Sequence, residues 1–236
     1  MSLEGKKIFV AGGTSGIGLA VARGAIERGA GVIVASRNRE RRDQAQAELG
    51  NGASVIEMDV TDDKSVSEAF AGVGALDHVV CTAPGAAVGP IAQLDTATAQ
   101  AAYNAKFWGA FRVAKYAEIR DGGTLTLISG QMARRPRKGL VMGGCVNTAV
   151  EALARGLASE LAPVRVNAVS PGFIDTPLHS RLSDQARSAA FKNASDNLPV
   201  HRPGKPEEIA SMIFEIMQNG FLTGSVIQVD GGAVVI

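Results

Sequence analysis

Short apolar runs alternate with longer amphipathic stretches along the 236 residues of the chain. The apolar runs are rich in β-branched residues, which is typical of strands covered on both faces of a sheet. We predict strands at Lys6–Ala11, Gly31–Ala35, Ser54–Met58, His78–Cys81, Thr124–Ser129, Arg165–Val169 and Val226–Val229. The amphipathic stretches predict helices at Gly18–Arg28, Arg39–Leu49, Asp63–Ala71, Thr96–Ile119, Gly143–Leu161 and Pro206–Met217. This alternation indicates an α/β fold, a doubly wound parallel sheet of about seven strands with helices on both faces.

The pattern contains no internal repeat, low-complexity segment or linker, so we expect residues 1–236 to form a single domain. Its longest irregular stretch is residues 170–205, which follows the sixth predicted strand and contains a polar helical segment, Leu182–Ala194. An insert beyond the carboxyl end of a strand lies where open α/β sheets bind ligands. We therefore expect this insert to be a substrate loop or lid, with a plain surface excursion as the alternative.

A glycine-rich segment, VAGGTSGIGL at residues 10–19, joins the first predicted strand to the first helix. Gly12, Gly16 and Gly18 follow the spacing G-x-x-x-G-x-G. Glycine permits a positive φ and leaves no Cβ between backbone and ligand. The N–H groups of the first helical turn then face an anion, and the helix dipole adds to the attraction. The segment predicts a turn that binds the diphosphate of a dinucleotide, although a turn without a ligand remains the alternative.

The ends of the next two strands indicate which dinucleotide this is. Ser36, Arg37 and Asn38 stand where an acidic residue would accept hydrogen bonds from a ribose 2′-hydroxyl. An arginine there suits a 2′-phosphate, so we predict NADP(H) in preference to NAD(H). After the third strand, Asp59 is placed to reach the adenine and Val60 to line its face. A helix cap is the alternative role for Asp59.

Composition indicates which partners, metal sites and cellular locations to expect. The 24 basic and 23 acidic side chains leave a net charge of +1, which predicts neither a nucleic-acid nor a membrane-surface partner. The two cysteines, Cys81 and Cys145, lack the paired spacing of a zinc site. The start of the chain has no secretory pattern and no apolar run is long enough to span a bilayer, so we expect a cytoplasmic location.

Several motifs, in order along the chain, resemble those of the short-chain dehydrogenase/reductase family. They are GGTSGIG at 12–18, DVTD at 59–62, YNAKFWG at 103–109, SPGFIDTP at 170–177 and LTGSVIQVDGG at 222–232. The resemblance extends over nearly the whole length and implies a Rossmann-type fold, usually assembled as a homodimer or homotetramer. It also implies hydride transfer between a nicotinamide and the carbonyl or alcohol carbon of a small molecule, here of unknown identity.

The cofactor contacts that we expect come from the motifs and from the strand ends. They are Gly12, Thr14, Ser15, Gly16, Ile17, Gly18, Ser36, Arg37, Asn38, Asp59, Val60, Ala83, Gly85, Pro171, Gly172, Ile174 and Thr176. After the fourth strand the chain reads Cys81-Thr82-Ala83-Pro84-Gly85, where the family usually has two asparagines, an alanine and a glycine. There Ala83 and Gly85 still allow the backbone to approach a cofactor, and Pro84 removes one N–H donor.

The resemblance fails at the residues that carry the chemistry. In the family a tyrosine exchanges the proton, a serine holds the substrate oxygen, and a lysine lowers the pKa of the tyrosine and binds the nicotinamide ribose. Aligning the helix that follows puts Gly130 at the serine position, Gly143 at the tyrosine position and Asn147 at the lysine position. Both tyrosines of the chain, Tyr103 and Tyr116, come earlier, so no shift of register supplies one. The two glycines at 143 and 144 should leave open space where the phenol ring would lie.

Two residues remain as catalytic candidates. Asn104 matches the asparagine that completes the proton relay of the family, and His179 lies on the insert, with an unperturbed pKa suited to acid–base work. A polar loop residue is the alternative reading of His179. We predict an NADP(H)-binding oxidoreductase with a non-standard proton donor, or a catalytically inactive nucleotide-binding pseudoenzyme that acts as a sensor or oligomer partner. A binding protein that no longer holds a dinucleotide is a third hypothesis.

Overall fold

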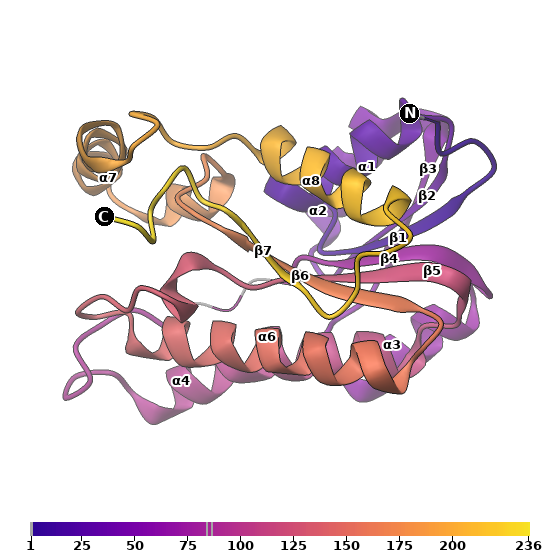
Figure 1. Ribbon diagram of the computed structural model, residues 1–236, viewed down its shortest axis with the longest axis horizontal. Helices are drawn as coiled ribbons and strands as arrows, with labels where there is room; N and C mark the ends of the chain where they lie inside the picture. Colours follow the sequence, from indigo (N-terminus) through magenta and orange to yellow (C-terminus); the bar gives the residue numbers. More distant parts are fainter. Residues whose placement is uncertain (1, 84, 86) are drawn as a thin grey trace.

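Seven parallel strands form one sheet in the order β3-β2-β1-β4-β5-β6-β7 (Figure 1). The computed structural model describes residues 2–83, 85 and 87–236. The strands are β1 (Lys7–Ala11), β2 (Gly31–Ser36), β3 (Ala53–Glu57), β4 (Leu76–Cys81), β5 (Ile119–Ile128), β6 (Arg165–Pro171) and β7 (Val226–Val229). The helices are α1 (Gly16–Ile26), α2 (Arg39–Leu49), α3 (Asp63–Ala71), α4 (Thr96–Tyr103), α5 (Gly109–Tyr116), α6 (Val141–Glu160), α7 (Asp184–Asn197) and α8 (Pro206–Gln218). The predicted α/β fold class is confirmed.

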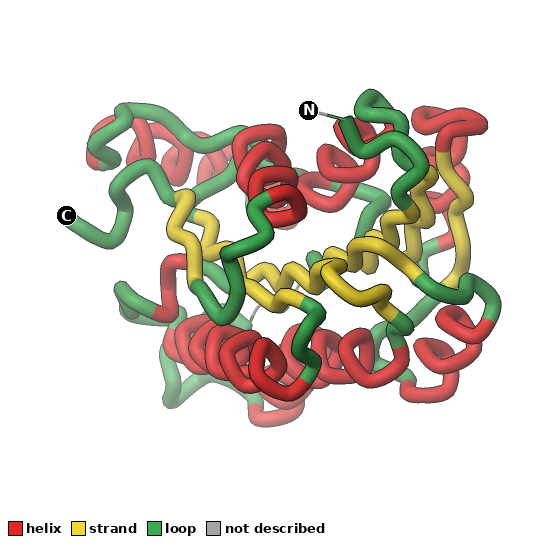
Figure 2. The backbone as a smooth tube through the Cα atoms, turned by 45° about the vertical axis from the view of Figure 1, so that its right-hand side comes forward, coloured by secondary structure: helices red, strands yellow, loops and turns green. Residues whose placement is uncertain are grey.

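Helices cover both faces of this sheet. Helices α1, α2 and α8 lie on one face and α3, α4 and α6 on the other (Figure 1), and the view turned by 45° shows the twisted sheet between the two layers (Figure 2). Within the described residues, no helix combines the length and apolar character needed to cross a membrane.

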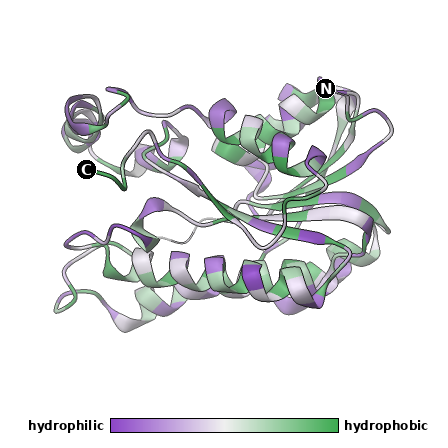
Figure 3. Ribbon diagram, viewed as in Figure 1, coloured by the Kyte–Doolittle hydropathy of each residue, from purple (hydrophilic) through white to green (hydrophobic). Residues whose placement is uncertain are grey.

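The pattern of β1 explains the two layers. Ile8 and Val10 belong to the core shared with α1 and α8, whereas Phe9 and Ala11 belong to the core shared with α3, α5 and α6. Alternate residues of a strand point to opposite faces, and helices cover both faces here, so all four side chains are fully buried. The hydrophobic colouring follows the strands and the inner sides of the helices (Figure 3). A continuous apolar strand is therefore what this position requires.

The predicted helix Thr96–Ile119 is wrong as a single element. It divides into α4, a π-helical turn η2 (Asn104–Trp108) and α5, and its last residue, Ile119, begins strand β5 instead. Ala117, in an extended conformation, ends α5. Single π-turns within helices occur frequently at functional sites. The turn matters here because it carries Asn104 and Lys106.

The insert at 170–205 is more regular than the sequence indicates. Strand β6 extends to Pro171, a 3₁₀ turn η4 (Pro177–Arg181) follows, and α7 realises the helical segment predicted at Leu182–Ala194. Ile174 pairs with Gly204 in a short parallel bridge, which closes the base of the insert. The insert therefore leaves the sheet at the carboxyl end of β6 and returns beside its own start.

Candidate functional site

The glycine turn joins β1 to α1 in a conformation that only glycine adopts readily. Gly12 has φ +82° and Gly16 has φ +52°. A Cβ on Gly18 would lie 2.5 Å from the carbonyl oxygen of Gly12, and a Cβ on Gly12 would lie 2.7 Å from Oγ1 of Thr82. The close packing and the backbone conformation of the turn therefore require these glycines. Without side chains at these positions, the backbone at the start of α1 stays uncovered.

The start of α1 has no side-chain cap among the described residues. Ser15 occupies the N-cap position without a side-chain hydrogen bond to the helix, whereas Asn38, Asp62 and Asp95 cap α2, α3 and α4. The first N–H groups of a helix have no partner within the helix and attract anions. Thr14 beside this turn is buried, and Ile17 packs partly against the core. The turn thus presents free backbone donors where the sequence predicts a diphosphate.

This turn lies at the point where the strand order reverses. Strand β1 pairs with β2 on one side and with β4 on the other, and open α/β sheets bind ligands at such a switch point. Thr82, directly after β4, donates through its hydroxyl to the carbonyl oxygens of Ala11 and Gly12 at 3.0 and 3.1 Å. Ala83 next to it is buried. The ends of β1 and β4 are therefore held together as one rim of the site.

Gly85 makes room for a helix in this structure. A Cβ on Gly85 would lie 2.5 Å from the carbonyl oxygen of Ala102 and 2.6 Å from Cβ of Lys106. The missing side chain allows α4 and η2 to approach the end of β4. Pro84, whose missing N–H the sequence analysis noted, lies outside the described residues.

The ends of β2 and β3 bring together Arg37, predicted to select the cofactor, and Asp59, predicted to reach its adenine. Nη1 of Arg37 lies 3.6 Å from Oδ2 of Asp59, and the Arg37 side chain is 67% exposed. Partial burial of Asp59 raises its pKa, but hydrogen bonds from Thr61 and the charge of Arg37 outweigh burial and hold the pKa below its usual value. Both charges are therefore present at neutral pH, with most of the guanidinium open to a ligand.

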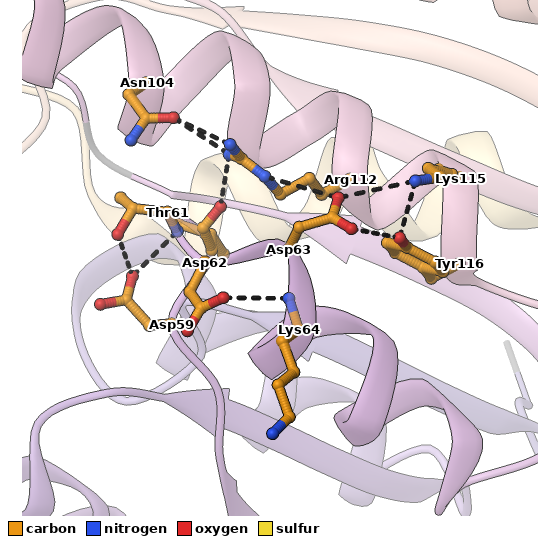
Figure 4. Close-up of polar contacts among 10 residues, drawn as sticks. Asp59, Thr61, Asp62, Asp63, Lys64, Asn104, Arg112, Lys115 and Tyr116 are labelled. Atoms are coloured by element: carbon orange, nitrogen blue, oxygen red, sulfur yellow. Dashed lines mark hydrogen bonds and ion pairs between the residues drawn. The ribbon is translucent and has the colours of Figure 1, made fainter.

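The alternative role of Asp59 as a helix cap is not realised. Asp62 caps α3 by accepting a hydrogen bond from the backbone of Lys64, while Asp59 accepts from the N–H and hydroxyl of Thr61 (Figure 4). Val60, between them, packs closely on Gly109 of α5, where an added Cβ would lie 3.1 Å from the Val60 side chain. The DVTD motif is thus a tight turn that fixes Asp59 at the sheet edge.

Ser36 and Asn38 play mainly backbone and capping roles. The carbonyl oxygen of Ser36 accepts a hydrogen bond from Nη1 of Arg42 at 3.0 Å. The side chain of Asn38 accepts from the backbone N–H of Arg41 at 2.8 Å and so caps α2. Of the three residues predicted at this strand end, Arg37 is the one whose charged group faces Asp59.

The SPGFIDTP motif carries the insert to the glycine turn. Pro171 ends β6, and Gly172 passes so close to the turn after β7 that a Cβ would lie 2.6 Å from backbone there. Ile174 is buried at the base of the insert. The side chain of Thr176 lies 3.2 Å from the position that a Cβ of Gly16 would occupy. Of the four residues predicted from this motif, Thr176 is therefore the one that meets the glycine turn.

The three positions at which the family resemblance predicts a serine, a tyrosine and a lysine also lie together. A Cβ on Gly130, at the serine position, would lie 2.8 Å from Nδ2 of Asn147, at the lysine position. At the predicted tyrosine position, the place where a Cβ of Gly143 would be has no described atom within 4 Å apart from its chain neighbours and the adjoining backbone of α6. Among the described residues, there is therefore room for at least a Cβ at Gly143, and the larger space for a phenol ring stays a prediction.

Asn104 has its side-chain oxygen bound by an arginine of α5. Its Oδ1 accepts two hydrogen bonds from the guanidinium of Arg112, both at 3.1 Å, and Arg112 also donates to the carbonyl oxygen of Val60 (Figure 4). The amide thus braces η2 and α5 against the DVTD turn. A catalytic role for Asn104 stays a prediction.

A lysine that the sequence analysis missed occupies the centre of the site. Lys106, in η2, donates from Nζ to Oδ1 of Asn147 at 2.6 Å and to the carbonyl oxygen of Ser129 at 2.7 Å. Burial lowers the pKa of Lys106 to about 8, although the negative charge of Glu151 acts to raise it. The sequence signal was a lone cation between Ala105 and Phe107, in an otherwise apolar segment.

The hydroxyl of Ser129, whose carbonyl oxygen binds Lys106, makes a buried hydrogen bond of its own. It donates to Oε1 of Glu151 at 3.0 Å, and Ser129 and Glu151 are both buried. Glu151 lies one helical turn after Asn147 on the buried side of α6. As the alternation of a strand predicts, Ser129 does not replace the serine missing at Gly130.

His179 lies within the insert. Its Nε2 is 2.9 Å from the carbonyl oxygen of Ile174, and its ring stacks on Phe173 with centroids 4.4 Å apart. The ring therefore holds η4 to the base of the insert. A proton-transfer role for His179 stays a prediction.

Comparisons with known proteins agree on one family. The family described as Enoyl-(Acyl carrier protein) reductase matches residues 11–234. The Short-chain dehydrogenase/reductase ucsE of Acremonium sp is 30% identical, over 99% of this chain and 97% of the relative. The 3-oxoacyl-[acyl-carrier-protein] reductase FabG of Thermotoga maritima is 29% identical, over 100% of both chains. A solved small-chain dehydrogenase in complex with NADPH is 35% identical with a TM-score of 0.86, over 98% of this chain and 99% of that chain.

Proposed function

Because this chain belongs to the short-chain dehydrogenase/reductase family, we propose that it binds NADP(H) and transfers a hydride to or from a small carbonyl or alcohol with a non-standard proton donor. The glycine turn carries this proposal, since its crowded glycines and uncapped helix start form a cradle for a diphosphate. The similar small-chain dehydrogenase solved with NADPH supports the same cofactor.

The residues present fit this cofactor. Gly12, Gly16 and Gly18 with the first N–H groups of α1 would hold the diphosphate, Arg37 would pair with the 2′-phosphate, and Asp59 would reach the adenine. When bound, the cofactor supplies or accepts the hydride. The substrate would lie beside Gly143, where the described chain leaves room for at least a Cβ.

The missing tyrosine limits the rate. A positioned general acid contributes about 10²–10⁴ in rate, or roughly 3–5 kcal/mol of barrier. Hydride transfer to an activated carbonyl remains accessible without it, with the proton taken from water, from the substrate or from His179. We therefore expect slow turnover, and only with electrophilic substrates.

A second candidate function is a nucleotide-binding pseudoenzyme that acts as a sensor or as a subunit of a homodimer or homotetramer. It is favoured by glycine at both 130 and 143, where the family resemblance implies a serine and a tyrosine, together with the crowded glycine turn and uncapped start of α1. This protein would keep the affinity for NADP(H) and lack turnover.

Calorimetric titration with NADPH and NADH, followed by NADPH oxidation with a panel of activated ketones, enones and imines, separates these functions. Tighter binding of NADPH together with turnover supports the oxidoreductase. Binding without turnover across the panel supports the pseudoenzyme. No binding of either dinucleotide overturns both and leaves a protein whose cleft has lost its cofactor.

A further inference from the structure

Lys106 reaches the site from a different helix than the one on which the family carries its lysine. Its Cα belongs to the π-turn η2, and its side chain passes Gly85 to the end of β5. There Nζ meets the carbonyl oxygen of Ser129 and Oδ1 of Asn147. An ammonium group thus touches the side chain at position 147, which itself carries no charge.

The direction of a dinucleotide across this sheet places its second half near Lys106. Arg37 and Asp59 mark the adenosine end at β2 and β3, and the glycine turn lies between β1 and β4. In a doubly wound sheet the dinucleotide continues across the switch point to the strands on the other side. Those strands are β4 and β5, and Ser129 directly follows β5.

We propose that Lys106 supplies, from η2, the cation that position 147 lacks, and that it binds the ribose hydroxyls on the nicotinamide side of NADP(H) while Asn147 orients it. This inference rests on the proposed binding of NADP(H). An ammonium group has three N–H donors. Two of them meet acceptors among the described residues, and the third is the one that a ribose oxygen would take.

The contact also explains why position 147 carries an amide. A lysine at 147 would replace the Asn147 Oδ1 acceptor, now 2.6 Å from Nζ of Lys106, with a second ammonium group. Two cations at this separation repel strongly in a desolvated site. An amide oxygen instead accepts a hydrogen bond from Lys106, and its Nδ2 donates to the carbonyl oxygen of Gly130 at 3.3 Å. Lys106 and Asn147 therefore act as a pair.

The groups that face Lys106 allow it to remain charged at neutral pH. Cys81 lies at the end of β4 and is a neutral thiol, since burial raises its pKa to about 11. Glu151, on α6, adds a favourable charge and receives the hydroxyl of Ser129. The two hydrogen-bond acceptors of Lys106, the side chain of Asn147 and the backbone of Ser129, are uncharged. They orient the ammonium group without cancelling its charge.

Moving the lysine from position 106 to position 147 tests the proposal through measurements of NADPH affinity, without an activity assay. Lys106→Met should weaken NADPH binding about 10- to 100-fold, the usual effect of losing a charge-assisted hydrogen bond. The double variant Lys106→Met with Asn147→Lys returns the cation to α6 and should restore the affinity to within about threefold of the wild type. Adenosine 2′,5′-bisphosphate, which contains only the adenosine half, should bind all three proteins equally.

The outcomes distinguish this inference from the proposed function. Equal NADPH affinity of the wild type and Lys106→Met overturns the inference and leaves the proposed function intact. A folded double variant that stays weak shows that Lys106 is only a structural tie between η2 and β5, and this also overturns it. A wild type that binds neither NADPH nor the bisphosphate overturns the proposed function and the inference together.

Amine labelling of the wild type gives a readout that needs no variant to fold. Reductive methylation followed by peptide mass spectrometry should show NADPH protecting Lys106 at least about fivefold more than adenosine 2′,5′-bisphosphate does, because only NADPH contains the second ribose. Lys64, whose side chain is 81% exposed, is the internal control and should react equally under both conditions. Equal protection of Lys106 by the two ligands overturns the proposal.

Discussion

Thr82 ties the glycine turn to the neighbouring strand, since its hydroxyl donates to the carbonyl oxygen of Gly12 at 3.1 Å. The same hydroxyl lies 2.7 Å from the place where a Cβ of Gly12 would be, and 2.8 Å from that of Gly18. The turn is therefore packed from both sides, by the end of β4 and by its own backbone. Its shape before a ligand arrives is fixed by these contacts.

Gly18→Ala should abolish dinucleotide binding. Its Cβ would enter the backbone of Gly12 and Gly13, at 2.5 and 2.8 Å, and overpacking of this kind costs about 1–3 kcal/mol of folding free energy. Titration with NADPH and thermal unfolding check both effects. The matched control is Gly156→Ala on α6. A Cβ there meets no described atom within 4 Å outside its own helix, so this substitution should stabilise the protein by about 0.5–1 kcal/mol. Normal NADPH affinity in Gly18→Ala would contradict the assigned turn.

Arg37→Ala should weaken the preference for NADPH over NADH. The guanidinium is exposed beside Asp59, so its loss removes the partner of the 2′-phosphate and leaves a carboxylate there. We expect NADPH affinity to fall about 10- to 100-fold and NADH affinity to change less than threefold, measured by calorimetry. Arg39→Ala, two residues away on α2, serves as the control for general loss of positive charge. An equal loss for both dinucleotides would contradict the assignment.

Gly143→Tyr should raise carbonyl reduction. The position has room for at least a Cβ among the described residues, and a phenol placed there would find Lys106 and Asn147 already in contact one turn away. We expect the rate of NADPH oxidation with an activated ketone to rise at least about tenfold, within the range of a positioned general acid. The rise should vanish in the background of Lys106→Met. No gain in a folded protein that binds NADPH would show that more than the phenol has been lost.

The affinity for NADPH should fall as the pH rises through about 8. Burial lowers the pKa of Lys106 from 10.5 to about 8, so its charge is present below that pH and lost above it. Calorimetry between pH 7 and 10 should show this loss in the wild type and a flatter profile in Lys106→Met. A decline of equal slope in both proteins would assign the titration to another group.

Acid should destabilise the fold through His78. This buried ring, 2.9 Å from the hydroxyl of Thr124, has its pKa lowered from 6.5 to about 4, mainly by burial. Between these pH values the unfolded chain binds the proton more tightly, so the free energy of unfolding falls as the pH falls. We expect His78→Gln to remove about 2 kcal/mol of the loss seen between pH 7 and 5, measured by urea unfolding. The exposed His201→Gln should leave the loss unchanged.

Local patterning was enough to predict much of the fold. The bounds of α2, α3 and β7 agree with the prediction to the residue. Asn38 and Asp62 cap the two helices through their own side chains, so the signal is contained within a few residues. The nucleotide side of the site was predictable for the same reason, since each motif follows the end of its strand.

The pairing of Lys106 with Asn147 was not predictable from local pattern. It depends on a π-turn inside a stretch that reads as one continuous helix, and on contacts between segments 41 residues apart. The direction of the Asn104 side chain was missed for a related reason, because Arg112 and the DVTD turn determine it. Side-chain chemistry at helix crossings follows from tertiary packing, which helical periodicity does not encode.

The contact between Thr176 and Gly16 has a consequence for the synthesis of the protein. The two residues are separated by most of the chain, yet the Thr176 side chain lies 3.2 Å from the place of a Gly16 Cβ. In a chain growing from its N-terminus, the contact of this turn with Thr82 can form once β4 has emerged, but the contact with Thr176 cannot form until residue 176 has emerged. A ligand held by both sides would stabilise only the completed chain. Ligand binding would thereby stabilise the completely folded chain, in addition to any role of the ligand in the reaction.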